Sequence, residues 1–227
     1  MIIRLHQLSA RAPHLQDSAE VAHLLSLYER AAIASEEQLE AELKERWQDC
    51  NFQMASDAWM IVTRQQHVIG YADVQRKNHE SLEPIYALKI AIHPEYQSRG
   101  IETLLIRLGE ERIRYLSRDL VGRCQIQIHV TVDSANSVLC EMMQHEGYCL
   151  QQQFLRMQFA LKHIADPLLS SEDGLLTLQV ALNDEQSMTS QVQGEAYRTS
   201  KYSVYVKTFG RRFQAEASTV LIPCATG

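Results

Sequence analysis

Residues 90–101 read Ile-Ala-Ile-His-Pro-Glu-Tyr-Gln-Ser-Arg-Gly-Ile. The apolar run that ends at Ile92 predicts a buried strand, and Pro94 stops it. A helix follows from near Gly100, because apolar residues then recur at helical spacing. Glycine lets the backbone approach a ligand closely, and the amides at a helix N-terminus can hold a phosphate without lysine or metal. The stretch therefore predicts a strand, a phosphate-binding turn and a helix.

The elements predicted on either side extend this unit to an α/β fold. Before it, the patterns indicate a strand at 2–5, helices from about residues 17 and 35, and strands at 59–63, 68–74 and 85–92. After it, they indicate a strand at 124–132, a helix from about residue 133 to Gly147, and one or two strands over 148–161. This order predicts a mixed, mostly antiparallel central sheet with helices on both faces.

Composition and charge limit the classes of function. Of 227 residues, 45% are hydrophobic and 22% are charged, as in soluble globular proteins. The formal net charge of -6 argues against nucleic acid as a partner. The cysteines number 5 and form no C-x-x-C pair, so neither a disulfide framework nor a zinc site is indicated, and no metal is expected. No apolar run is long enough for a membrane span or a signal peptide, which predicts a cytoplasmic protein without membrane association.

The quoted stretch resembles the coenzyme A motif of the GNAT N-acetyltransferase superfamily, which runs strand, V-x-P, Q/R-x-x-G-x-G/A and helix. Gln97 and Gly100 match this pattern, and the resemblance covers residues 2–161. Asn136 opens a helix that ends in Glu146-Gly147-Tyr148, which is similar to a second segment that flanks the coenzyme in the family. The resemblance implies the GNAT acyl-CoA N-acyltransferase fold, with acetyl-CoA as the acyl donor.

By this resemblance, the cofactor is bound mainly by backbone groups. The amides of about Gln97 to Thr103 hold the diphosphate, and the backbone of Ile90 and Ile92 pairs with the pantetheine arm. Arg99 lies inside the loop and is better placed than Arg107 to reach the coenzyme phosphates. The implied cofactor-binding residues are Ile90, Ala91, Ile92, Gln97, Ser98, Arg99, Gly100, Ile101, Glu102, Thr103 and Asn136.

Two positions depart from the family pattern. Glu102 stands where the family has Gly or Ala, and its carboxylate would compete with the diphosphate for the helix N-terminus. We expect Glu102 to turn away to solvent, the alternative being weakened coenzyme binding. Met143 replaces the tyrosine that usually protonates the departing thiolate. Cys140 and Tyr148 are the candidate substitutes, with packing as the alternative role for both.

The reaction that the resemblance implies requires a base. An alkyl ammonium has a pKa of about 10.4 and must lose a proton before it attacks the thioester. Glu83, before the central strand, and Asp73, on the adjacent strand, are the candidate catalytic residues, with a solvated charge as the alternative for each.

The residues after 161 form a second segment with weaker patterns. We expect a GNAT domain at 1–161 and a C-terminal extension at 162–227, with strands at 175–181, 204–208 and 219–222 and a helix at 183–197. The extension is interpreted either as a partial second GNAT repeat, as in a truncated tandem GNAT protein, or as a segment that adds strands to the sheet or forms a dimerisation arm.

The leading hypothesis is an N-acetyltransferase that moves an acetyl group from acetyl-CoA to a primary amine of a small molecule or peptide. Its alternative is a catalytically impaired coenzyme-binding GNAT domain with a regulatory or dimeric scaffold role, which Glu102 and Met143 motivate. A homodimer is compatible with either function, and the sequence leaves the acceptor unidentified.

Overall fold

The structure is a computed structural model, which describes residues 8–28, 35–77, 83–160, 175–181 and 198–210. Two 3-10 turns, Leu15–Asp17 and Pro94–Tyr96, accompany the helices and strands. The elements are β1 (Leu8–Arg11), α1 (Ser18–Tyr28), α2 (Glu36–Gln48), α3 (Met54–Asp57), β2 (Ala58–Thr63), β3 (Val68–Arg76), β4 (Ile85–Ile92), α4 (Ile101–Leu116), β5 (Gln125–Asp133), α5 (Ser137–His145), β6 (Cys149–Ala160), β7 (Leu175–Ala181) and β8 (Arg198–Gly210). None of these helices is long and apolar enough to span a membrane.

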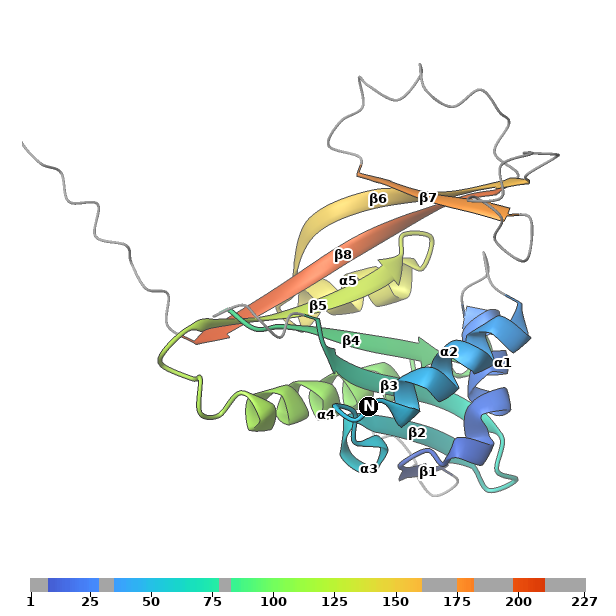
Figure 1. Cartoon of the computed structure of the whole chain (residues 1–227), viewed down its shortest axis with the longest axis horizontal. Helices are drawn as coiled ribbons and strands as arrows, with labels where there is room; N and C mark the ends of the chain where they lie inside the picture. The colour runs from blue at the N-terminus through green and yellow to red at the C-terminus, as the bar shows by residue number, and fades with distance from the viewer. Residues whose placement is uncertain (1–7, 29–34, 78–82, 161–174, 182–197, 211–227) are drawn as a thin grey trace, which may run out of the picture.

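The strands form one eight-stranded sheet in the order β1-β2-β3-β4-β5-β8-β6-β7 (Figure 1). All neighbouring strands are antiparallel except β4 and β5, which are parallel. The predicted mixed, mostly antiparallel sheet is thus confirmed. The predicted strand at 2–5, the helix at 183–197 and the strand at 219–222 lie wholly or mainly outside the described residues.

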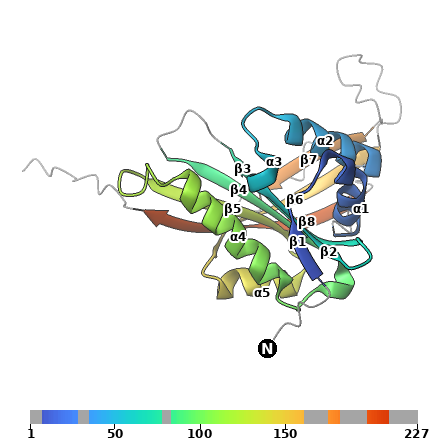
Figure 2. The same cartoon turned by 90° about the horizontal axis from the view of Figure 1, so that it is seen from below.

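Helices cover both faces of the sheet, as expected. Figure 2 shows α1, α2 and α3 on one face and α4 and α5 on the other. On the first face, Leu25 and Leu43 pack against Met60 and Tyr71 of the sheet. On the second, α4 and α5 pack against the alternate residues of the same strands, among them Leu88, Ile90, Ile126 and Ile128. The central strands are therefore buried on both sides, which explains the nearly continuous apolar sequence of β4.

Helix α2 begins where the sequence predicts a cap. The Ser35 hydroxyl accepts a hydrogen bond from the Gln38 amide at 3.3 Å, and the Gln38 side chain accepts one from the Ser35 amide at 2.9 Å. This reciprocal capping box fixes the start of the helix. Leu39, Leu43 and Trp47 then face the sheet, which brings the neighbouring Arg46 over β3.

Strands β4 and β5 pair over only part of their length. The pairs run from Ile85 and Gln127 to Ala87 and His129, after which no pair joins the two strands, although β4 continues to Ile92 and β5 to Asp133. The backbone groups on this edge of β4, from Leu88 to Ile92, therefore lack a strand partner. Unpaired backbone donors and acceptors of this kind can bind an extended ligand as a further strand would.

Strand β8 lies inside the sheet, although it belongs to the segment expected as an extension. It pairs with β5 from Gln125 and Gly210 to Asp133 and Tyr202, and with β6 on its other side. The strands expected at 175–181 and 204–208 are present as β7 and part of β8. The described part of residues 162–227 therefore completes the same sheet, which without β8 would have a gap between β5 and β6.

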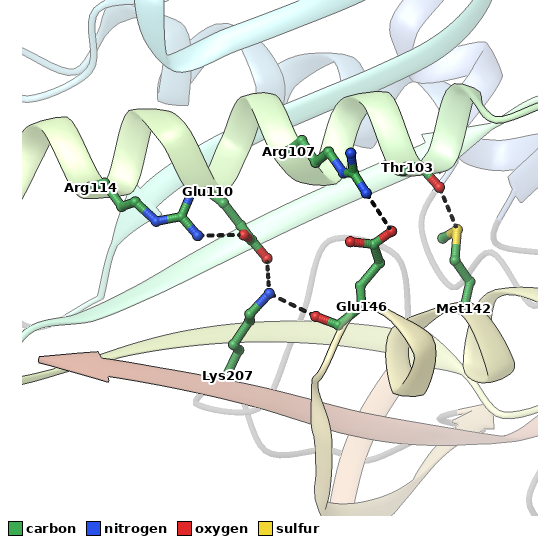
Figure 3. Close-up of polar contacts among 7 residues, drawn as sticks. All are labelled: Thr103, Arg107, Glu110, Arg114, Met142, Glu146 and Lys207. Carbon is green, nitrogen blue, oxygen red and sulfur yellow. Dashed lines mark hydrogen bonds and ion pairs between the residues drawn. The ribbon is translucent and has the colours of Figure 1, made fainter.

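A cluster of charges joins α4, α5 and β8 (Figure 3). The buried carboxylate of Glu110 on α4 accepts hydrogen bonds from Arg114 and from the ammonium of Lys207 on β8, both at 2.8 Å. Lys207 also donates to the carbonyl oxygen of Glu146 at 2.7 Å, at the end of α5. One ammonium group therefore bridges three elements on the α4 and α5 face of the sheet.

Candidate functional site

The quoted stretch folds as predicted, into a strand, a turn and a helix. After Ile92 the chain makes the 3-10 turn Pro94–Tyr96, and α4 begins at Ile101. Ser98 and Gly100 have φ angles of 60° and 84°, in the left-handed region that favours glycine. The Arg99 side chain stays within the loop, where it donates to the carbonyl oxygen of Glu95 at 2.9 Å and lies over the Tyr96 ring.

Glu102 is not turned to solvent, so that expectation is wrong. Glu102 is only 3% exposed, and its carboxylate accepts a hydrogen bond from the Ser98 amide at 2.7 Å. The amide and the positive end of α4 offset the cost of burying the charge. One amide of the predicted phosphate cradle is therefore occupied by the protein's own carboxylate.

A cavity of about 190 Å³ lies next to this loop. It brings Gln97 of the loop together with Asn136, the residue expected from the second matching segment. The Asn136 side chain caps α5 by accepting from the Leu139 amide at 3.1 Å. Ile90, Ala91 and Ile92 have buried side chains, so only their backbone is suited to ligand contact.

A larger cavity of about 460 Å³ lies on the sheet face that also carries α1 and α2. Its walls come from β3 to β8, together with Tyr28 at the end of α1 and Arg46 of α2. Tyr28 and Asp133 line both cavities. The two cavities are therefore neighbours, near the end of β5 that no longer pairs with β4.

The sequence from residue 21 to residue 144, which is α1 to α5, matches the model of the Acetyltransferase (GNAT) family. The chain belongs to this family. No curated protein sequence gives a significant match. Solved structures agree on the GNAT fold, although every one described here is at most 20% identical to the chain.

One of these is a GCN5-related N-acetyltransferase from Sphaerobacter thermophilus, with a TM-score of 0.59 and 20% identity over 69% of this chain and 48% of that one. The chain thus spans about half of that relative's length. A GNAT acetyltransferase from Streptococcus pneumoniae has a TM-score of 0.50 and 13% identity over 89% and 100% of the two chains. A GNAT phosphinothricin acetyltransferase from Sinorhizobium meliloti, solved with acetyl-CoA, has a TM-score of 0.50 and 13% identity over 90% and 89%.

Within the GNAT fold, the candidate base Asp73 lines the larger cavity, but its carboxylate is already engaged. It accepts hydrogen bonds from Arg46 at 3.0 Å and from the Tyr71 hydroxyl at 2.8 Å, and its side chain is 3% exposed. Burial, together with the charge of Asp73, raises the pKa of Tyr71 well above its usual value. These contacts hold the Asp73 carboxylate in place, which suits a structural anion better than a group that accepts a proton during turnover.

The other candidate base, Glu83, lies apart from both cavities. It is exposed, it precedes β4 by two residues, and it is not among the residues that line either cavity. The loop lies at the opposite end of β4, roughly 23 Å away at the usual rise of a strand. The structure therefore does not bring Glu83 together with the other candidate residues.

His129 is one of the residues of the larger cavity that were not predicted from the sequence. It sits on β5 in the last pair before the strands separate, and it lines the larger cavity. Its Nε2 lies 2.9 Å from the side-chain oxygen of Gln127, and burial lowers the pKa of the imidazole. The signal was present, since Gln127, His129 and Thr131 alternate with the buried Ile126, Ile128 and Val130, which predicts a polar face on this strand.

The candidate substitutes for the missing tyrosine do not line either cavity. Met143 lies on the buried side of α5 and belongs to the same hydrophobic core as Tyr148. Burial raises the pKa of the Tyr148 phenol, and its ring lies 5.2 Å from the Lys207 ammonium on the α4 and α5 face. Cys140 packs at the edge of the same core, on α5. Packing is therefore the role that these contacts favour for Cys140 and Tyr148.

Proposed function

We propose that this GNAT protein transfers the acetyl group of acetyl-CoA to a primary amine of a small molecule or peptide. The observation that carries the proposal is the separation of β4 from β5 after Ala87 and His129, beside two neighbouring cavities that share Tyr28 and Asp133. A transferase needs adjoining sites for donor and acceptor, because the amine of the acceptor must reach the thioester of the donor.

The donor side is formed by β4 and the loop. Acetyl-CoA supplies an activated acetyl group as a thioester. The edge of β4 from Leu88 to Ile92 has backbone groups free for the amides of the pantetheine arm. The amides at the start of α4 would face the diphosphate, with the exception of the Ser98 amide, which donates to Glu102.

The acceptor side is the larger cavity, where we assign proton removal to His129. A half-buried imidazole with a lowered pKa is neutral at physiological pH and can accept a proton from the incoming ammonium. When Nε2 donates to Gln127, the lone pair of Nδ1 is the accepting site. Asp73 would then hold Arg46 at the cavity wall, and Glu83 would have no part in the reaction.

A second candidate function is a coenzyme-binding GNAT domain with impaired catalysis and a regulatory role. The hydrogen bond between Glu102 and Ser98 favours it, because a buried anion in the loop opposes diphosphate binding. The two functions differ in turnover and share coenzyme binding.

Titration with acetyl-CoA followed by an amine panel separates the two functions. Isothermal titration is expected to show one binding site, and thiol release with some amine of the panel is expected for the transferase. Binding without turnover on any amine would favour the regulatory domain, and absence of binding at millimolar acetyl-CoA would contradict both.

The candidate bases are compared by conservative variants in the same assay. We expect His129→Asn to lower kcat by ~10²-fold or more, the range for loss of a general base. Glu83→Gln should keep the wild-type rate. If Glu83→Gln or Asp73→Asn lowers kcat while His129→Asn does not, our assignment of the base is wrong.

A further inference from the structure

Arg156 is a cationic side chain of the larger cavity that has no anionic partner among the described residues. It lies on β6 and lines the cavity, and its Nε atom is buried without a hydrogen-bond partner. No carboxylate of the described residues forms an ion pair with it. A guanidinium stays charged at any physiological pH, so this charge needs a partner that the described protein does not supply.

The guanidinium is also held in one orientation. Its central carbon lies 4.7 Å from the centre of the Tyr202 ring, a distance at which the ring face attracts the cation. Tyr202 in turn stacks on Phe154, with ring centres 5.4 Å apart. A planar donor fixed on an aromatic surface is suited to bind a carboxylate or phosphate through two parallel hydrogen bonds.

The charge of the cavity points the same way. Its described lining residues include four cationic side chains, Arg46, Lys77, Lys89 and Arg156, and two anionic ones, Asp73 and Asp133. Arg46 is paired with Asp73 at 3.0 Å, and Asp133 accepts from the Ala135 amide at 2.9 Å. The positive surplus would repel a polyamine and attract an amine that also carries a negative group.

We propose that the acceptor is a primary amine that carries an oxyanion, a carboxylate or a phosphorus acid, and that Arg156 binds this oxyanion. The inference rests on the proposed function, because it names the acceptor class of the same cavity. Arg156 is here a specificity residue. It takes no part in proton transfer, so its loss should weaken substrates that carry the anion far more than substrates that lack it.

The strand register gives the spacing between the two ends of the acceptor. Arg156 lies over Tyr202, which pairs with Asp133, and Asp133 follows His129 by four residues on β5. This is roughly 13 Å along the strand. The amine at His129 and the oxyanion at Arg156 are therefore separated by a spacer of several atoms, as in an ω-amino acid or a short peptide.

The test compares matched pairs of amines at saturating acetyl-CoA. Each pair contains an ω-amino acid and its amide, with aminoalkylphosphonates and a polyamine as further arms. We expect kcat/KM to be roughly tenfold or more higher for an anionic member than for its amide, which corresponds to the added charged hydrogen bonds. The phosphonate arm tells which oxyanion is preferred.

Three variants tie the preference to one residue. Arg156→Ala should abolish the preference for the anion by lowering kcat/KM far more for the anionic member than for its amide, and Arg156→Lys should keep part of the preference. Lys201→Ala is the matched control, since Lys201 is exposed on β8 next to Tyr202 and does not line the cavity. Equal rates for anion and amide, a polyamine as the best acceptor, or equal losses on both pair members in Arg156→Ala would overturn the proposal.

Equilibrium binding keeps this test independent of turnover. Titration of the same carboxylates without acetyl-CoA should show binding that Arg156→Ala removes. Such binding without any acetyl transfer would contradict the proposed function and support the anion site. If the wild-type protein binds no carboxylate and no phosphonate, the anion site is contradicted, even if the amides bind or are acetylated.

Discussion

The Glu102 carboxylate accepts a hydrogen bond from the Ser98 amide at 2.7 Å, in the loop where the diphosphate of acetyl-CoA would bind. At this residue the chain replaces the small residue of its family by a buried anion. The cost is like-charge repulsion with the ligand, and the gain is a satisfied amide in the free protein. We therefore expect Glu102 to weaken coenzyme binding and to stabilise the loop of the free protein.

Removing the charge at position 102 should tighten coenzyme binding. We expect the Kd for acetyl-CoA to fall by about tenfold in Glu102→Gln and in Glu102→Ala, because both lose the repulsion. The alanine variant should also lose about 1 kcal/mol of unfolding free energy, since the Ser98 amide loses its acceptor, and the glutamine variant should lose less. Titration calorimetry and urea unfolding measure the two quantities. Weaker binding in both variants would show that Glu102 supports the coenzyme site.

The imidazole of His129 should determine how activity depends on pH. Burial lowers its pKa below the usual value of about 6.5, so the acid limb of the kcat profile should lie below that pH. In His129→Asn, this acid limb should disappear, and kcat should be much lower at every pH. His67→Asn, an exposed histidine in the β2 to β3 turn, is the control and should keep the wild-type profile. A limb that persists in His129→Asn belongs to another group.

The same shift predicts how stability depends on pH. Because the folded state disfavours the imidazolium, the unfolded state binds more protons at position 129 once the pH falls through about 6.5. The free energy of unfolding should therefore fall with pH from there until the lowered pKa of the folded state is passed. His129→Asn should reduce this loss, which urea unfolding at pH 5 and 7.5 can measure. An identical loss in both proteins would contradict the assignment.

At the scale of elements, the Lys207 ammonium joins α4, α5 and β8 (Figure 3). Its partner Glu110 has a side chain that is 6% exposed, so the carboxylate depends on Lys207 and Arg114 for compensation. Lys207 is 27% exposed, which reduces the strength of the pair. The cluster fixes α5 against the sheet, and α5 carries Asn136 at its start.

Lys207→Met should therefore destabilise the protein. We expect a loss of about 1–3 kcal/mol, less than for a fully buried pair because Arg114 remains bound to Glu110. Lys201→Met, at an exposed position of the same strand, should change the unfolding free energy by less than about 0.5 kcal/mol. Chemical denaturation measures both. A loss in Lys207→Met no larger than in the control would mean that the cluster adds nothing to stability.

Most elements could be predicted from local sequence, whereas their contacts could not. The apolar run before Pro94 predicts β4, and the helical spacing after Gly100 predicts α4 and hence the loop between them. Each prediction needs only residues that are neighbours in the sequence. The exposure of Glu102 depends on its contact with Ser98 in a folded turn, and the role of His129 depends on how far β4 and β5 pair. Neither is visible in a periodic pattern, because both follow from the arrangement of elements in space.

At the scale of the whole molecule, the sheet is completed by a strand from near the end of the chain. Gln125 pairs with Gly210, although the two residues are far apart in the sequence. No local pattern could therefore predict that β8 lies between β5 and β6. The domain boundary expected at residue 161 is based only on a change in composition and on weaker patterns after it. Within the described residues, β7 and β8 extend the sheet of the first 160 residues.

A chain that ends at residue 161 should therefore fail to fold as an independent domain. Without β8, the facing edges of β5 and β6 lose all their pairing, and Val204 and Tyr202 no longer line the larger cavity. We expect no cooperative thermal transition for residues 1–161, whereas the full chain should show one. A cooperative transition with native circular dichroism in the shorter chain would support the domain boundary expected from the sequence.

The proposed function requires acetyl-CoA to bind at the turn between β4 and α4, and titration calorimetry on two glycine variants can test this binding. Gly100 and Gly122 have φ angles of 84° and 93°, so alanine costs about 1–2 kcal/mol of backbone strain at either. Of the two, only Gly100 lies in the loop, and an added Cβ at Gly122 would meet no atom of the described residues within 4 Å. We predict that wild type and Gly122→Ala bind acetyl-CoA equally, while Gly100→Ala binds about tenfold more weakly or not at all. Equal affinity in all three proteins, or no binding to the wild type, would contradict acetyl-CoA binding at this turn.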